Sequence, residues 1–201
     1  MLRSLLIILF ANLILTPLAG YAQGTIVFLN GKEKRFEAAE IKGEYLHYSV
    51  EGDTMDFKKV VDRYNVFSLK YDNGTEDVLY KPDTTYGEDP SVEEVRDYIK
   101  GEQYAMKRYR KPMNFISGVG VGLASSAAGF YGIPIPLAYS TVLGRFDPKV
   151  PANEDGSIQS ESFKMGYQKK ARNIKIKNSL LGGAVGFAVG ITALVVIFSN
   201  D

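Results

Sequence analysis

The chain has 201 residues, of which 45% are hydrophobic and 23% charged, and its 24 Lys and Arg residues nearly balance 23 Asp and Glu residues, giving a net charge of +1. It contains no cysteine and a single histidine, His47. Disulfides, thiolate metal sites, thiol nucleophiles and a cysteine-linked lipid anchor are therefore excluded. The sequence predicts no metal site, no cofactor and no catalytic residue, and hence a protein that is not an enzyme.

Residues 1–22 have the order of an export signal. Arg3 precedes an apolar run over residues 5–15, and small residues occupy Gly20 and Ala22. This arrangement predicts a signal peptide that is removed after Ala22, and therefore a location in the bacterial cell envelope. The alternative is an uncleaved N-terminal anchor, although the apolar run is short for a membrane span.

Residues 23–82 are predicted to form a small β domain. Runs rich in β-branched and aromatic residues alternate with turn dipeptides such as Asn30-Gly31 and Asn73-Gly74. Between residues 45 and 50, Leu46 and Tyr48 fall on one face. Five or six short strands of this kind favour an antiparallel meander or an SH3-like barrel within an α+β chain.

The β region is acidic and the remainder of the chain is basic near its apolar segments. Between residues 23 and 90 there are nine Lys or Arg and fourteen Asp or Glu residues, a balance of 9 − 14 = −5. An acidic domain next to basic apolar flanks makes nucleic acid an unexpected partner.

A polar linker over residues 83–90 leads to a predicted amphipathic helix over residues 91–111. Ser91 and Glu94 have the spacing of a capping box, and Pro112 ends the helix. Gly101 is expected to weaken its middle. The apolar stripe of this helix is predicted to consist of Val92, Val95, Ile99, Met106 and Tyr109.

The first predicted membrane segment covers residues 113–143. No charged residue lies between Lys111 and Arg145, and one helix of that length would measure about 50 Å, against a hydrocarbon core of about 30 Å. We therefore expect a break near residues 132–136, with one span before it and a short interfacial or re-entrant piece after it. Small residues at every fourth position predict two close-packing ridges, which are Gly118, Gly122 and Ser126, and Gly120, Ala124, Ala128 and Gly132.

The second predicted transmembrane helix covers residues 179–199, after a basic connecting loop and helix over residues 144–178. Gly182, Gly186 and Gly190 form its packing ridge, which is expected to oppose the ridge of Gly118. The two spans would cross in opposite directions, with the connecting stretch in the cytoplasm and the β domain in the periplasm. Basic residues expected to set this topology or to bind lipid headgroups are Lys164, Lys169, Lys170, Arg172, Lys175 and Lys177.

Two motifs that could carry chemistry have simpler explanations. Gly118-Val-Gly120-Val-Gly122 is followed by leucine at position 123, where a dinucleotide fingerprint has its third glycine, and it also lacks the later acidic residue of that fingerprint. The carboxylates of residues 72–77 lack the spacing of a calcium loop, so a hairpin turn is the better account.

The order of elements resembles a loosely defined group of exported bacterial envelope proteins without an assigned activity. The resemblance rests on Val66-Phe-Ser-Leu69, on Tyr98-Ile-x-Gly101-Glu102, and on Gly166-Tyr167 ahead of the basic run. The two glycine-patterned segments also resemble glycine-zipper two-helix modules, although more than thirty residues separate them here. These resemblances imply a β domain followed by a membrane hairpin.

We therefore expect a membrane-anchored envelope protein that presents a periplasmic β domain for structural or protein-interaction roles. Its expected partners are membrane lipid and either further copies of itself or other envelope proteins. The inner membrane is the expected location and the outer membrane is the alternative. A second hypothesis is a small pore or a transport-accessory subunit, whose polar lining would have to come from Ser117, Ser125, Ser126 and Thr192.

Overall fold

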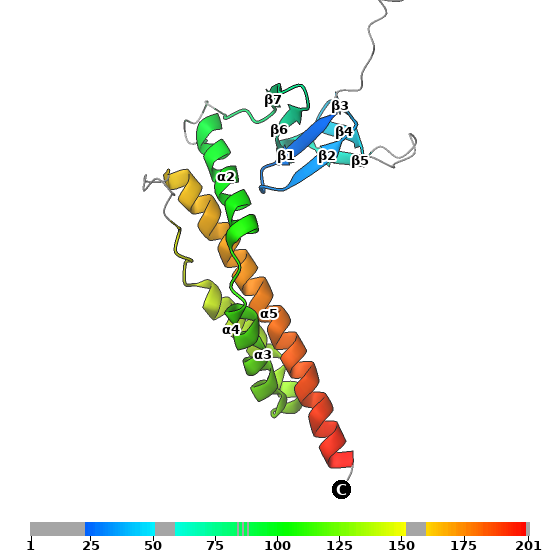
Figure 1. Cartoon of the computed structure of the whole chain (residues 1–201), viewed down its shortest axis with the longest axis vertical. Helices are drawn as coiled ribbons and strands as arrows, with labels where there is room; N and C mark the ends of the chain where they lie inside the picture. The colour runs from blue at the N-terminus through cyan, green and yellow to red at the C-terminus, as the bar shows by residue number, and fades with distance from the viewer. Residues whose placement is uncertain are drawn as a thin grey trace, which may run out of the picture. The chain divides into compact units, whose positions relative to one another are not determined.

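The computed structural model describes residues 23–50, 59–83, 85, 87, 89–151 and 160–199. The expected signal peptide lies outside these residues, as do residues 152–159 of the connecting stretch. The described chain is α+β and divides into two compact units (Figure 1). One unit holds residues 23–27 and 33–79, and the other holds residues 28–32 and 80–199.

The β unit contains two antiparallel sheets. The first has the strand order β2-β1-β6-β7 and the second has the order β3-β4-β5. The strands are β1 (Gly24–Phe28), β2 (Glu33–Phe36), β3 (Ala38–Lys42), β4 (Tyr45–Ser49), β5 (Lys59–Asp62), β6 (Val66–Tyr71) and β7 (Glu76–Val78), with a 3-10 turn at Arg63–Asn65 before β6. These seven described strands exceed the expected five or six because the chain bends at Glu37 and divides one stretch into β2 and β3.

Large side chains fill the interior of this unit. Leu46 and Tyr48 are buried on the face that the alternation predicted, together with Ile26, Phe36 and Phe67. The predicted dipeptides Asn30-Gly31 and Asn73-Gly74 lie at turns. Gly31 and Gly74, like Gly43, adopt a left-handed φ that disfavours other residues. A hydrophobic core of this kind is typical of a domain that folds in water.

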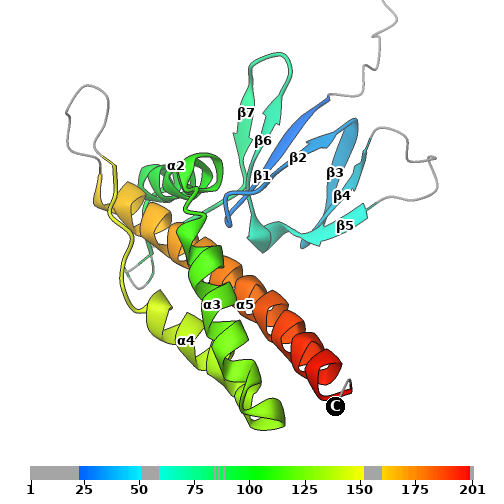
Figure 2. The same ribbon diagram turned by 60° about the horizontal axis from the view of Figure 1, so that its bottom comes forward.

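The second unit is built along one long helix. The helices are α2 (Val92–Arg108), α3 (Met113–Ser126), α4 (Pro134–Gly144) and α5 (Glu161–Ser199), with a 3-10 turn, η2, at Gly129–Gly132. The 39 residues of α5 extend over about 58 Å at 1.5 Å per residue. Helix α2 packs against the N-terminal half of α5, and α3 and α4 pack against its C-terminal half (Figure 2).

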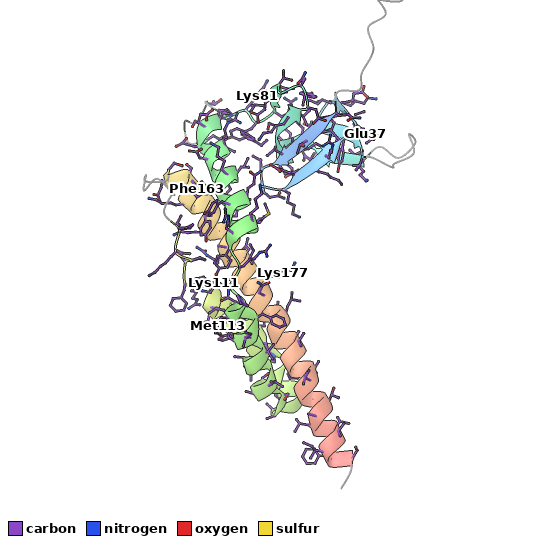
Figure 3. All side chains as sticks on the ribbon, viewed as in Figure 1. Glu37, Lys81, Lys111, Met113, Phe163 and Lys177 are labelled. Carbon is purple, nitrogen blue, oxygen red and sulfur yellow. The ribbon has the colours of Figure 1, made fainter. Side chains whose placement is uncertain are left out.

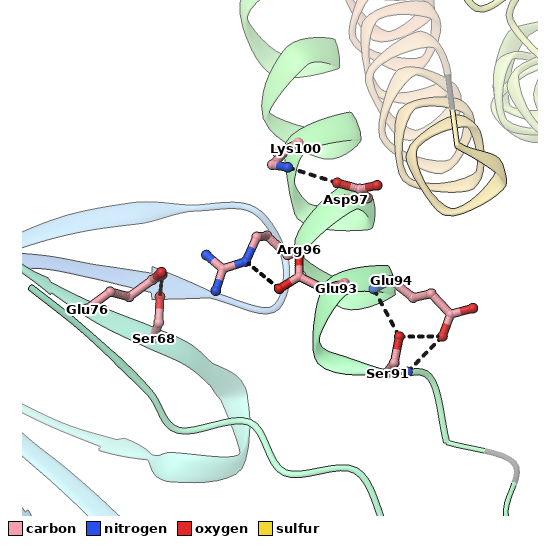
Figure 4. A network of polar contacts seen from close by, with 8 residues as sticks. All are labelled: Ser68, Glu76, Ser91, Glu93, Glu94, Arg96, Asp97 and Lys100. Atoms are coloured by element: carbon pink, nitrogen blue, oxygen red, sulfur yellow. Dashed lines mark hydrogen bonds and ion pairs between the residues drawn. The ribbon is translucent and has the colours of Figure 1, made fainter. Parts of the chain in front are cut away.

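The predicted capping box at the start of α2 is confirmed. The Ser91 hydroxyl accepts from the Glu94 N–H at 3.3 Å, and the Glu94 carboxylate accepts from the Ser91 N–H at 2.8 Å (Figure 4). The Ser91 hydroxyl also donates to the Glu94 carboxylate at 2.7 Å, and this bond, followed by the one from the Ser91 N–H, holds the pKa of the Glu94 carboxyl below its ordinary value. Val95, Ile99 and Tyr109 are buried as the stripe predicted, whereas Met106 is 37% exposed and lies outside it.

Gly101 has a different role from the weak point that the sequence predicted. A Cβ at Gly101 would overlap the Phe163 carbonyl oxygen of α5. In return, a Cβ at Gly166 would overlap the Tyr98 carbonyl oxygen of α2. The absence of both side chains therefore permits the close approach of the two helices.

Helix α3 runs parallel to α5, and α4 returns antiparallel to it. Gly118 lies against Ser179 and Ser126 lies against Gly190, so the contacts advance together along α3 and α5. On α4 the order is reversed, because Pro136 lies against Gly183 whereas Gly144 lies against Ile176.

This arrangement differs from the expected hairpin of two antiparallel spans, which the structure does not show. The chain reverses before the predicted break, at Gly129, whose φ is 58°. Pro134 then starts a new helix at a position where no backbone N–H is needed.

Candidate functional site

The C-terminal half of the helical unit buries small side chains and exposes large ones. Its buried positions are Gly118, Gly122, Ser125, Ser126, Gly132, Pro136, Ser140, Gly144, Ser179, Gly182, Gly183, Gly186 and Gly190. Large apolar side chains point outward instead, including Leu181 at 50% exposure, Val189 at 55% and Phe198 at 74%. This is the reverse of the β unit, and of water-soluble proteins in general.

Two of the predicted small-residue ridges face each other within the chain. A Cβ at Gly122 would overlap the Gly183 carbonyl oxygen, and a Cβ at Gly186 would overlap the Val119 carbonyl oxygen. Gly118, Gly182 and Gly190 make equivalent contacts with Ser179, Phe115 and Ser126, respectively. The backbones of α3 and α5 are therefore in direct contact along this ridge.

The other predicted ridge of α3 does not take part in this contact. Gly120, Ala124 and Ala128 are exposed, and a Cβ at Gly120 would meet no atom within 4 Å. Its last member, Gly132, lies after α3 and is buried, where a Cβ would overlap the Ser125 carbonyl oxygen. The glycine-rich motif that includes Gly120 lies inside α3 rather than after a strand, so it lacks the setting of a nucleotide-binding loop.

The four hydroxyl groups that the sequence offered for a polar lining bond to their own helices, whereas the buried Ser179 hydroxyl has no hydrogen-bond partner among the described residues. Ser125 donates to the Gly122 carbonyl at 2.9 Å, and Ser126 donates to the Leu123 carbonyl at 2.7 Å. Ser117 and Thr192 donate in the same way to Asn114 and Ala188. The hydroxyls that a polar lining would need are thus already satisfied by backbone carbonyls.

Helix α5 is long and apolar enough to cross a membrane, by length and composition. Its most apolar 18-residue window has a mean hydropathy of 2.4, and only 22% of that window is buried within the chain. It is the one helix with this property in the described part of the chain. Helices α3 and α4, with 14 and 11 residues, extend over only about 21 Å and 17 Å.

Five of the six basic residues that the sequence singled out make side-chain contacts, Lys175 among them. Lys164 pairs with Glu161 at 3.3 Å, and Arg172 pairs with Asp147. Lys170 donates to the Asn30 carbonyl at 3.0 Å. Lys169 lies 5.2 Å from the centre of the Tyr98 ring, and a hydrogen bond that its ammonium group donates to the Tyr98 hydroxyl raises the pKa of this lysine.

Lys175 and Lys177 belong to a further group of basic residues. This group lies at the point along α5 where the buried side chains change from large to small. Lys111, before α3, and Arg145, after α4, lie near these two lysines, because the charge of Lys111 acts on Lys175, and Lys175 donates to the carbonyl of Phe146, the residue after Arg145. Figure 3 shows Lys111 and Lys177 at similar heights along α5. We call this group the basic collar, and its members are Lys111, Arg145, Lys175 and Lys177.

Lys175 is the most enclosed member of the collar. Its Nζ donates to the Phe146 carbonyl at 3.2 Å and lies 5.8 Å from the centre of the Phe146 ring. Burial, followed by the nearby charge of Lys111, lowers the pKa of the Lys175 ammonium group. The collar therefore brings like charges together on its α3 side.

The remaining candidate residues of the β unit form no reactive group. His47 lies on β4 opposite Glu40 and Val60. Residues 72–77 include the turn between β6 and β7, where the Gly74 N–H donates to the Tyr71 carbonyl at 3.0 Å. Over the described ranges, no group of three or more potential metal ligands is present.

Comparisons with models of protein families, with curated proteins and with solved structures found no match for this chain. The resemblance to exported envelope proteins and the function therefore rest on the residues of this chain.

Proposed function

We propose that this chain is a non-enzymatic, membrane-anchored envelope protein that holds a small β unit at a membrane surface. The observation that carries the proposal is the reversed burial in the C-terminal half of the helical unit. Helices pack in lipid through small residues and present large apolar residues to the acyl chains. The charge-free end of α5, residues 178–199, would extend over about 33 Å and could cross a bilayer.

In this proposal α3 and α4 form a re-entrant hairpin and α5 provides the only crossing of the helical unit. Both shorter helices fall short of the roughly 30 Å hydrocarbon core. The collar would then lie at the headgroup level on one side, where basic residues are favoured. The pore alternative is less well supported, because its hydroxyl groups bond to their own helices.

The proposed orientation differs from the one expected for a two-span hairpin. Since α3 and α4 return to the same side, the β unit, the collar and the connecting stretch lie on one side, and residue 200 lies on the other. An export signal in residues 1–22 would place that first side in the periplasm. The positive-inside rule would place it in the cytoplasm.

Cysteine labelling tests this topology, because the chain has no cysteine of its own. We expect Ser160→Cys and Thr75→Cys to react with an impermeant maleimide once the outer membrane is permeabilised. Asn200→Cys should react only after lysis of the inner membrane. Labelling of Asn200→Cys together with Thr75→Cys, while Ser160→Cys stays protected, would restore the two-span hairpin.

Two further outcomes bear on which membrane holds the protein. If all three variants react before the inner membrane is breached, the outer membrane is the location. If alkaline carbonate releases the wild-type chain from the membrane fraction, the protein is not an integral membrane protein and the proposal fails.

A further inference from the structure

An apolar groove of about 590 Å³ lies between α4 and α5. Its walls include Pro134, Pro136 and Leu137 from α4, and Leu180, Ala184 and Phe187 from α5. The volume is in the range of small-molecule sites. Neither wall offers a charged side chain, so the groove suits a hydrocarbon chain.

Each wall of the groove leads to a basic residue of the collar. On α4, Leu137, Thr141 and Arg145 follow one another at four-residue intervals, which places them on one stripe of the helix. On α5, Lys177 precedes Leu180 and Ala184 by three and seven residues, which also places it on their stripe.

The two basic residues flank one contact between α4 and α5. A Cβ at Gly144 would be 2.5 Å from the Ile176 Cδ1 atom, and Arg145 and Lys177 each directly follow one of these two residues in the sequence. Both side chains are exposed, and neither forms an ion pair with any residue that the structure describes. Asp147, the nearest acidic residue in the sequence, is paired with Arg172.

We propose that the groove binds one acyl chain of an anionic phospholipid, whose phosphate group is held by Arg145 and Lys177. A guanidinium and an ammonium group together suit a phosphate diester, because the guanidinium can donate two parallel hydrogen bonds to its oxygens. The proposal rests on the membrane-anchoring function proposed above, and it adds a lipid class and a defined site.

The test compares two double variants that remove the same charge. Arg145→Gln with Lys177→Gln removes both cations at the groove, whereas Lys107→Gln with Lys111→Gln removes two exposed cations ahead of α3. The full chain in a mild detergent is titrated with dioleoyl phosphatidylglycerol or dioleoyl phosphatidylcholine and followed by native mass spectrometry. We expect the groove variant to bind phosphatidylglycerol about 30-fold more weakly, since each charge near a headgroup contributes about fivefold.

The matched variant should retain wild-type affinity and preference for phosphatidylglycerol. Equal affinities for both double variants would overturn the proposal, as would equal wild-type affinity for the two lipids. Ala184→Phe, which fills the groove and keeps both cations, should also weaken phosphatidylglycerol binding. If glycerophosphoglycerol, which has no acyl chains, competes as well as the lipid, the groove plays no part and the proposal is wrong.

Failure of this proposal can be separated from failure of the anchoring function. A chain that resists alkaline carbonate but shows no difference between the double variants is still anchored without this lipid site. If alkaline carbonate releases the chain from membranes, the proposed anchoring function itself is wrong.

Discussion

Replacing Gly186 by leucine is expected to separate α3 from α5. A Cβ at this position already overlaps the Val119 carbonyl oxygen, and the Val119 Cα atom lies 2.9 Å from it. Because backbone atoms cannot rotate away as a flexible side chain can, the helices must move apart along the ridge. Overpacking of this kind costs about 3 kcal/mol or more, which corresponds to a fall of about 10 °C in the apparent Tm of the helical unit.

Gly120→Leu provides the matched control for this substitution. It introduces the same side chain into α3 at an exposed position with no atom within 4 Å, and leucine has the higher helix propensity. Thermal unfolding in detergent, followed by circular dichroism, should show a lower Tm for Gly186→Leu and no loss for Gly120→Leu. If the two variants unfold at the same temperature, α3 and α5 do not pack through the ridge of Gly186.

The four-residue spacing of glycine and serine residues could be predicted to mark packing faces, since small residues let backbones approach. The ridge of Gly118 was expected to face that of Gly182, as it does, but the spacing alone did not carry that choice, because the ridge of Gly120 follows the same interval. That choice depends on the rotation of α3 about its axis. The rotation is fixed by its neighbours along the chain and not by its own pattern.

The sequence pattern also could not predict the direction of α3 relative to α5. A charge-free stretch with a proline-rich break is compatible with one span and an interfacial piece or with a re-entrant pair. The left-handed φ of Gly129 decides it, and that φ is not visible in the sequence. The Gly101–Gly166 contact was missed for a related reason, because a single glycine in each helix gives no periodic signal.

Local signals gave the most dependable predictions. The alternation of residues 45–50 predicted which face of β4 is buried, and the Ser91–Glu94 spacing predicted the start of α2. Both depend on residues within one element. The collar, in contrast, joins the start of α3, the end of α4 and the middle of α5. Its members could be recognised in the sequence as basic residues beside the apolar segments, but not as one group, because they are distant in sequence.

The packing also bears on assembly. Gly118, Gly122, Gly182, Gly186 and Gly190 are buried within one chain. A second copy could use this ridge only if α3 left its place on α5. The arrangement therefore supports internal packing as the role of this ridge in the proposed function, in preference to oligomerisation.

The largest effect is expected from charges on the outward face of α5. Leu181, Val185 and Val189 lie at four-residue intervals and are 50%, 49% and 55% exposed. If this face contacts lipid, a lysine near the middle of the span costs roughly 2.5–3.5 kcal/mol, and three together cost about 8–10 kcal/mol. The triple variant with lysine at all three positions should therefore be absent from the carbonate-resistant membrane fraction, as quantified by immunoblotting.

A matched double variant, Met165→Lys with Asn173→Lys, places lysines on exposed positions in the N-terminal half of the same helix. This half lies ahead of the charge-free segment, so the control should remain in the membrane fraction at the wild-type level. In water the triple substitution would instead remove exposed apolar surface at little cost, because isolated surface changes rarely exceed about 0.5 kcal/mol. A triple variant that is soluble and keeps the thermal unfolding of the wild type would therefore show that this face of α5 lies in water, and the anchoring proposal would have to be abandoned.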